Sequence, residues 1–158
     1  MIRNADFVEK QLKGNVVGKK AQNGFDLSLK EVKSISGIGI IHKDKTEVVS
    51  YNSLPTTKEG YYDLPKGVYS ITFNEGVVIP QGHSGMIKTR SSLVRNSCVI
   101  DSGWYDTGFN VEEIGAMLFV NGDSVRIQQD ARVAQLILFE SEEAELYDGQ
   151  WQGTKDKK

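Results

Sequence analysis

The chain has 158 residues, 39% of them hydrophobic, and its 19 lysines and arginines against 21 acidic residues leave a net charge of −2. This length fits one domain with a real core, and the single cysteine, Cys98, cannot form an internal disulfide, which excludes a disulfide-stapled secreted scaffold and favours a reducing, cytoplasmic compartment. The near-zero charge argues against a nucleic-acid coat, and no apolar run approaches the roughly 20 residues of a membrane span.

The first segment predicts a short N-terminal helix. Asn4 can cap its start, and Phe7, Val8 and Leu12 fall on one side of it before Gly14 ends it. The N-terminal MIRNADFVEK also lacks the apolar core of a signal peptide.

After this helix the pattern changes to short β-strands. Residues 69–73 and 124–128 alternate apolar and polar side chains, which is the period of a half-buried strand. Residues 116–120 and 133–139 are more continuously apolar, which predicts strands buried on both faces. Because 16 glycines interrupt these runs, the sequence predicts one all-β domain, residues 1–158, built as a barrel or sandwich with a charged turn at residues 42–47.

The residue types exclude several chemistries. His42 and His83 lie far apart, and the chain has no CxxC, HxE or HExxH motif, so it lacks the ligands of a zinc-dependent deaminase. The segment GNVVGKK lacks the spacing and the Ser or Thr of a Walker loop. Cys98, within the apolar CVI, predicts a buried thiol rather than a nucleophile.

Four segments combine polar groups with strand ends, and the first of them is KTRSSLVR. It places Arg90 and Arg95 around Ser91 and Ser92, within residues 76–100, a stretch that has no acidic residue. Guanidinium and hydroxyl donors in this arrangement suit a polyphosphate. A capped turn with solvated arginines is the alternative.

The other three segments carry an acid, an amide and aromatic rings. In SGWYDTGFN the isolated Asp106 lies among aromatics and glycines, which suits contact with a sugar or base, although a hairpin with core aromatics is the alternative. In DARVAQLIL a single amide, Gln135, needs a partner from backbone or ligand. In YDGQWQG, Tyr147 and Trp151 belong to a polar tail, residues 147–158, which predicts a flexible lid that closes on a flat ligand.

The order and spacing of these motifs resemble the dUTPase and dCTP deaminase family over nearly the whole chain. The resemblance also includes NGFDLSL at residues 23–29, AMLFVN at 116–121 and RVAQLILF at 132–139. It implies a distorted jelly-roll or β-barrel fold of the β-clip type, a homotrimer, and active sites built from neighbouring subunits. Members of the family either hydrolyse the α–β phosphate bond of dUTP or deaminate dCTP without zinc.

Within this family the sequence favours a dUTP diphosphatase. The deaminases use a glutamate in a strand motif similar to LEFxN, and that position falls on Leu118, which cannot move a proton. The stretch NVEEIG is longer than the family pattern, so Glu112 or Glu113 could reach the base. A dCTP deaminase, or a bifunctional deaminase and dUTPase, is therefore the alternative. YDGQWQG resembles the deaminase-type tail. This tail combined with a dUTPase-type strand at residues 116–121 resembles the dUTPases of archaea or viruses that are built on the deaminase framework. A catalytically silent nucleotide-binding regulator is the third alternative.

The resemblance also implies roles for single residues. Asp106, in the GWxDxGF frame, is favoured over Asp101 as the base that activates water for attack on the α-phosphorus. Mg²⁺ is expected to be held by the substrate phosphates, with Asp26 either supporting its water shell or stabilising a turn. Ser91 is expected as a second catalytic residue, at the α–β bridge of the triphosphate. The base and sugar are expected to contact Phe109 at the deoxyribose, Trp151 at the uracil and backbone groups of residues 97–104 at the base edge, and Trp104 is a further expected substrate contact. The expected phosphate contacts are Arg90, Ser92, Arg95, Gln135, Tyr147 and Gln152.

Overall fold

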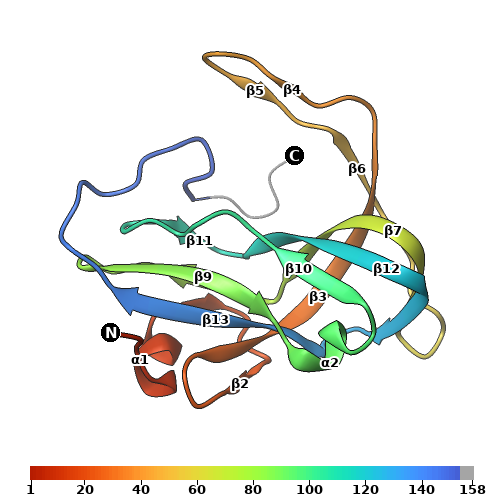
Figure 1. Ribbon diagram of the computed structural model, residues 1–158, viewed down its shortest axis with the longest axis horizontal. Helices are drawn as coiled ribbons and strands as arrows, with labels where there is room; N and C mark the ends of the chain where they lie inside the picture. Colours follow the sequence, from red (N-terminus) through yellow and green to blue (C-terminus); the bar gives the residue numbers. More distant parts are fainter. Residues whose placement is uncertain (154–158) are drawn as a thin grey trace.

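The structure is a computed structural model, and it describes residues 1–153 of the chain, so residues 154–158 of the expected tail lie outside the described range. Within that range strands predominate (Figure 1). No helix in residues 1–153 is long and apolar enough to cross a bilayer. In chain order the elements are α1 (Ala5–Lys10), β1 (Leu12–Gly14), β2 (Lys19–Lys20), β3 (Phe25–Ser36), β4 (Ile40–Ile41), β5 (Thr46–Glu47), β6 (Ser50–Ser53), β7 (Tyr61–Phe73), β8 (Glu75–Val78), β9 (His83–Thr89), α2 (Ser91–Val94), β10 (Cys98–Asp101), β11 (Asn110–Val111), β12 (Gly115–Gln128) and β13 (Arg132–Glu140).

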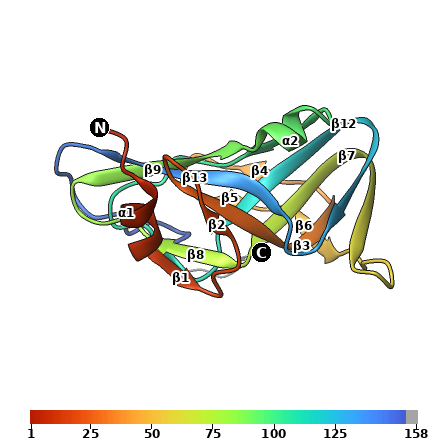
Figure 2. The same ribbon diagram turned by 90° about the horizontal axis from the view of Figure 1, so that it is seen from below.

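The predicted N-terminal helix is present, but it is shorter than expected. The Phe7 amide donates to the Asn4 side-chain oxygen at 3.0 Å, which confirms the predicted cap. The helix ends at Lys10, so the expectation that it continues to Gly14 is wrong. Leu12 pairs instead with Val77 of β8, because ladder bonds to β8 replace another helical turn. Figure 2 shows α1 beside β2 and β13.

The principal sheet confirms the predicted all-β barrel. Its order is β10–β12–β7–β3–β13–β9, with β2 and β6 also pairing with β3. The Thr89 hydroxyl donates to the Ile100 carbonyl at 3.1 Å and accepts from the Ile100 amide at 2.9 Å, which ties β9 to β10 and brings the two edges of the sheet together. A smaller sheet, β1–β8–β11, lies beside it, and the β4–β5 hairpin, with the predicted charged turn, projects from the body (Figure 1).

The core follows the predicted alternation near the end of β12 but only in part along β7, where Thr72, expected on the polar face, is buried as well. Tyr69, Ile71 and Phe73 are buried on β7, and Ile127 is buried near the end of β12. Fully burying a side chain of this size contributes about 1.5–3 kcal/mol. The Cys98 thiol is also buried, as predicted, and burial raises its pKa, which makes it a poor nucleophile.

The prediction that residues 116–120 are buried on both faces is wrong. Leu118 is 1% exposed and faces the core, whereas Met117 is 39% exposed. Half-buried Phe119 pairs with Val99 of β10 on one side and Val68 of β7 on the other, and both valines are exposed. We call Val68, Val99, Met117 and Phe119 the outer face. The same alternation in residues 133–139 leaves Ile137 and Phe139 half-buried.

A buried carboxylate, Glu75, joins the N-terminal loop to the barrel. Its side chain is fully buried at the start of β8. Both of its oxygens accept hydrogen bonds, all at 2.8 Å, from the amides of Val17, Gly18 and Ser28 and from the Ser28 hydroxyl. The Asn74 amide donates to the same hydroxyl at 2.8 Å. Each buried polar group here therefore finds its partner within the protein.

Candidate functional site

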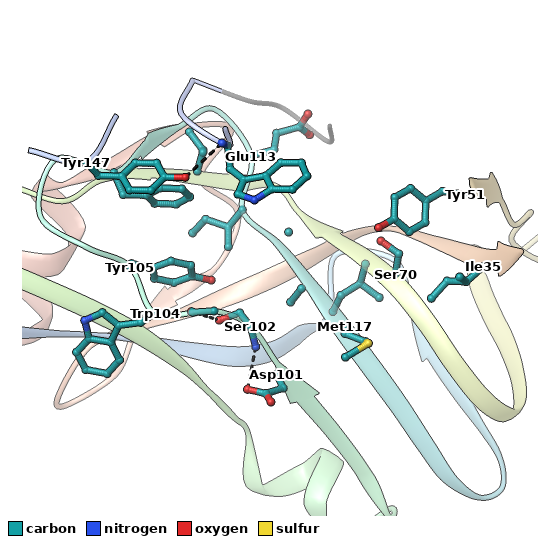
Figure 3. Close-up of a pocket in the computed structure, with 18 residues that line it drawn as sticks. Ile35, Tyr51, Ser70, Asp101, Ser102, Trp104, Tyr105, Glu113, Met117 and Tyr147 are labelled. Atoms are coloured by element: carbon teal, nitrogen blue, oxygen red, sulfur yellow. Dashed lines mark hydrogen bonds between the residues drawn. The ribbon is translucent and has the colours of Figure 1, made fainter. Parts of the chain in front are cut away.

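A cavity of about 550 Å³ lies between the principal sheet and the C-terminal tail (Figure 3). This volume is within the range of small-molecule sites. Its apolar floor comes from β3, β7 and β12, and its walls come from the loop after β10 and from the tail. The aromatic and polar lining residues are Tyr51, Ser70, Asp101, Ser102, Trp104, Tyr105, Phe109, Glu113, Tyr147 and Trp151.

The tail forms one wall of the cavity because backbone hydrogen bonds hold it on the loop before β11. The Tyr147 amide donates to the Thr107 carbonyl at 2.7 Å, and the Gly153 amide donates to the Asn110 carbonyl at 2.7 Å. Between these two bonds the Trp151 amide donates to the Tyr147 hydroxyl at 3.2 Å. Both predicted tail aromatics therefore lie at the cavity.

The Gln152 side chain supplies a further attachment for the tail. Its amide nitrogen donates to the Gly108 carbonyl at 2.8 Å and to the Tyr147 carbonyl at 2.9 Å, and its oxygen accepts from the Asn110 amide at 2.8 Å. Gly108 has a positive φ of 85°, and a Cβ there would lie 2.9 Å from Leu146 Cβ, so glycine permits the tail to approach. The expected contact of Gln152 with phosphate stays a prediction.

Phe109 and Trp104, two of the expected substrate contacts, lie on the cavity wall. The Phe109 ring lies nearly parallel to that of Tyr105, with centroids 5.3 Å apart, and meets Tyr147 edge-on at 5.4 Å. Trp104 is 53% exposed and stacks on Phe139 at 5.8 Å. Residues 104–109 and the tail thus supply the aromatic rings of the cavity wall, whereas Phe139 lies outside the lining.

Tyr105 is a cavity residue that the sequence reasoning missed. Its side chain is 5% exposed, and its hydroxyl, which points into the cavity (Figure 3), has no hydrogen-bond partner within residues 1–153. Burial raises the pKa of Tyr105 to about 12; the nearby Ser102 hydroxyl opposes this shift and the charge of Asp101 adds to it. The Ser102 hydroxyl is nevertheless not a hydrogen-bond partner of Tyr105, and its own proton is donated to the Gly103 carbonyl at 2.9 Å. Tyr105 therefore presents a neutral, unpaired hydroxyl to the cavity.

The two aspartates that compete for the catalytic role lie in different surroundings. Asp101 lines the cavity, and its carboxylate accepts from the Ser102 amide at 2.9 Å. Asp106 is exposed beside the cavity and does not line it. Within residues 1–153, no hydrogen bond or ion pair engages the Asp106 carboxylate.

Glu113 is the second carboxylate of the cavity lining. Its side chain is 12% exposed and forms an ion pair with Lys30. Glu112, by contrast, lies outside the cavity and pairs with Lys13 at 2.7 Å. The long stretch between Phe109 and β12 thus brings one of its two glutamates to the cavity.

The residues of KTRSSLVR lie away from this cavity in the protomer. Ser91 and Ser92 begin α2 and are exposed, as is Arg95 at its end. Arg90 precedes α2; its guanidinium forms an ion pair with Asp26 at 3.2 Å and donates to the carbonyl of residue 132 at 3.1 Å. Figure 1 shows α2 below the principal sheet, whereas the tail lies above β11.

Asp26 and Gln135 are engaged within the protein. Asp26 is 6% exposed and its carboxylate pairs with both Arg90 and Arg132, the latter at 3.3 Å. Gln135 is half-buried and donates to the Asn23 carbonyl at 2.8 Å, so its partner is backbone. In the part of the chain that the structure describes, no group of three His, Cys, Asp or Glu residues could hold a metal ion.

On β12 the side chains that line the cavity cannot carry protons. Ala116 and Met117 belong to the lining, whereas Leu118, to which the deaminase glutamate was assigned, faces the core. Neither a methyl nor a thioether group acts as a general base.

Comparisons with known proteins agree in pointing to one family. A family model described as dCTP deaminase-like matches residues 1–141. A protein of Methanosarcina acetivorans named probable deoxyuridine 5'-triphosphate nucleotidohydrolase is 31% identical over 161 residues, which cover 99% of this chain and 90% of that protein. The protein of the same name from Aeropyrum pernix is 31% identical over 144 residues, 90% of each chain.

Two solved structures share the fold. A 2'-deoxycytidine 5'-triphosphate deaminase from Agrobacterium tumefaciens superimposes with a TM-score of 0.67 at 14% identity, over 87% of this chain but only 46% of that longer one. The dUTPase of EIAV superimposes with a TM-score of 0.57 at 16% identity, over 89% of this chain and 97% of that one.

Proposed function

The chain belongs to the dCTP deaminase-like family, and we propose that within it this protein hydrolyses dUTP to dUMP and pyrophosphate. The observation that carries the choice is on β12, where the cavity meets Ala116 and Met117 and Leu118 faces the core. This strand supplies no group to move the protons that deamination requires. The archaeal relatives named as dUTP nucleotidohydrolases match the chain along nearly its full length and support the same choice.

Asp106 is the proposed base of this hydrolysis. Its exposed carboxylate is engaged by no group of residues 1–153 and is available to orient a water, whereas Asp101 already accepts from the Ser102 amide. The water oxygen forms a bond to the α-phosphorus, its proton passes to the carboxylate, and the bond to the α–β bridging oxygen breaks, releasing pyrophosphate. Ser91, Arg90, Ser92 and Arg95 are the proposed phosphate contacts.

The proposed magnesium ion is held by substrate phosphates rather than by a protein cage. When bound, Mg²⁺ neutralises part of the charge on the triphosphate. Asp26 does not fit the alternative role in its water shell, because Arg90 and Arg132 already pair with this buried carboxylate. The network supports the turn-stabilising role for Asp26 instead.

We propose that the enzyme is a homotrimer whose sites are shared between subunits. The outer face of Val68, Val99, Met117 and Phe119 is a continuous apolar row. Met117 also lines the cavity, so a subunit packed on this row borders the site. Among residues 1–153, no lysine or arginine lines the cavity to meet a triphosphate, and α2 of a neighbouring subunit would supply such cations.

Subunit complementation tests this sharing. Asp106→Asn and Arg95→Ala proteins, each inactive alone, are mixed after mild denaturation and refolding. If the two residues of one site come from different subunits, some mixed sites are intact and part of the dUTP turnover returns. No recovery in a mixture whose oligomers have exchanged subunits, as seen by native mass spectrometry, contradicts the shared site.

Product analysis tests the proposed reaction directly. The purified protein is incubated with Mg²⁺ and either dUTP or dCTP, and dUMP, pyrophosphate and ammonia are measured. We expect dUMP and pyrophosphate from dUTP and no ammonia from dCTP. Ammonia from dCTP without pyrophosphate from dUTP contradicts the proposal.

Deamination is the second candidate because Glu113 lies at the cavity. Its carboxylate could move protons at a pyrimidine, although the ion pair with Lys30 engages it in this structure. If dCTP releases ammonia, Glu113→Gln removes that activity. A catalytically silent regulator would instead bind a non-hydrolysable dUTP analogue, protect its tail from protease, and leave dUTP intact.

A further inference from the structure

Tyr105 differs from the other buried polar side chains of this protein. Among the side chains of residues 1–153, the Tyr105 hydroxyl is the buried group left without a hydrogen-bond partner. An unsatisfied buried group of this kind costs about 1–3 kcal/mol. Because the hydroxyl points into a cavity large enough for a ligand (Figure 3), a bound molecule is the natural source of its missing partner.

The barrel fixes the position of this hydroxyl. The amide and carbonyl of Tyr105 both bond to Gly85 of β9 at 2.9 Å. A Cβ at Gly85 would lie 2.6 Å from a methyl carbon of Leu138, so glycine at this position leaves room for the Leu138 side chain of the neighbouring strand β13. The parallel Phe109 ring then restricts the orientation of the Tyr105 ring. The hydroxyl is held in place before any ligand binds, which lowers the entropic cost of using it.

Tyr105 differs from Asp101, Ser102 and Glu113, which also line the cavity, because its hydroxyl is free to donate a hydrogen bond. Asp101 and Glu113 are carboxylates, which accept hydrogen bonds when ionised, and the Ser102 proton is used on the Gly103 carbonyl. Tyr105 remains protonated at neutral pH, since burial raises its pKa to about 12. The cavity therefore offers a fixed, neutral donor to a ligand acceptor.

We propose that the Tyr105 hydroxyl donates a hydrogen bond to a carbonyl oxygen of the pyrimidine ring and is a specificity-determining residue of this cavity. The proposal rests on the proposed function, because it takes the ligand to be the base of dUTP. The aromatic wall of Phe109, Tyr147 and Trp151 suits a flat ring, and the donor lies at its edge.

Tyr105→Phe tests the role, because it removes the hydroxyl and keeps the ring. We expect the Kd for α,β-imido-dUTP, measured by calorimetry, to rise about five- to tenfold, the effect of one hydrogen bond. The melting temperature should be unchanged or higher, since the free protein loses an unsatisfied polar group. An unchanged Kd overturns the inference.

Tyr69→Phe is the matched control. Tyr69 is also buried, but its hydroxyl donates to the Pro65 carbonyl at 2.6 Å and lies outside the cavity. This variant should lower the melting temperature and leave the Kd unchanged. If both variants weaken binding equally, the effect of Tyr105→Phe is structural and the inference fails.

Thiocarbonyl analogues identify the contact on the base. The 2-thio and 4-thio forms of the same nucleotide analogue each replace one carbonyl by a weaker acceptor. In the wild type, one of them should bind several-fold more weakly, and that loss should disappear in Tyr105→Phe. If Tyr105→Phe changes the effect of neither the 2-thio nor the 4-thio substitution, the assignment of the contact to the base is overturned. Failure of the wild type to hydrolyse dUTP would defeat the proposed function, whereas an unchanged Kd in Tyr105→Phe with normal hydrolysis defeats only this inference.

Discussion

Two buried polar side chains of this protein, Glu75 and Tyr105, differ in whether the fold supplies their hydrogen-bond partners. Glu75 is fully buried and accepts hydrogen bonds from the Val17, Gly18 and Ser28 amides and the Ser28 hydroxyl. Tyr105 is almost as deeply buried, yet its hydroxyl has no partner within residues 1–153. A buried polar group that finds its partners internally stabilises the fold, whereas one that faces a cavity without a partner is available for a ligand.

The aspartates repeat this contrast. Asp26 is buried between two guanidinium groups and serves the structure. Asp106 is exposed, and nothing in residues 1–153 engages its carboxylate. Substitutions at the engaged sites should therefore change stability, and those at the free sites should change activity or binding.

The largest expected effect follows from changing Asp106. Asp106→Asn removes the proposed base while keeping the size of the side chain, so kcat for dUTP should fall about 1,000-fold. The Kd for α,β-imido-dUTP should change little. Asp101→Asn should reduce kcat much less, because Asp101 already accepts from a backbone amide. The reverse ranking, measured by steady-state kinetics, would assign the base to Asp101.

The next effect is on stability, at Glu75. Glu75→Gln places an amide NH₂ against amides that need an acceptor, so the free energy of unfolding should fall by about 2–4 kcal/mol. Urea unfolding measures this loss, and kcat of the folded fraction should be kept. Asp63→Asn is the control: Asp63 pairs with Arg126 at the surface, and its loss should cost less than about 1 kcal/mol. Equal losses at both positions would contradict the structural role of Glu75.

The smallest expected effect is a pH dependence at Tyr105. Its pKa in the folded protein is about 12, against an ordinary value of 10.0, so the unfolded chain loses this proton first. The free energy of unfolding is therefore independent of this group below pH 10 and falls between pH 10 and 12, by about 1 kcal/mol per pH unit. In urea unfolding at pH 9 and 11, Tyr105→Phe should lose less stability than the wild type. Identical losses would mean that Tyr105 is not buried in the free protein.

Local patterns predicted the elements well. The Asn4 cap depends on near neighbours in sequence and is confirmed, and the burial of Tyr69, Ile71 and Phe73 follows the local alternation. The expected exposure of Thr72 is wrong, because this side chain is buried too. The prediction of two-sided burial for residues 116–120 is wrong, because Met117 and Phe119 lie on the outer face. The proposed neighbouring subunit would cover that face, which would explain why an apolar run is exposed in the single chain.

The site was predicted only in part. Motif order led to Phe109, Trp104, Tyr147 and Trp151, which do line the cavity. Tyr51 and Ser70 could not be found in this way, because long-range strand pairing brings them there. Tyr105 carried no signal either, since an unpaired hydroxyl is a property of the packed structure and not of the residue type.

A crystal structure of the protein with α,β-imido-dUTP and Mg²⁺ tests the account most directly. We expect the pyrimidine in the cavity with one carbonyl oxygen within hydrogen-bond distance of the Tyr105 hydroxyl, and the phosphates on α2 of a neighbouring subunit. A nucleotide bound with its base outside this cavity, and with Tyr105 still unpartnered, would contradict the account.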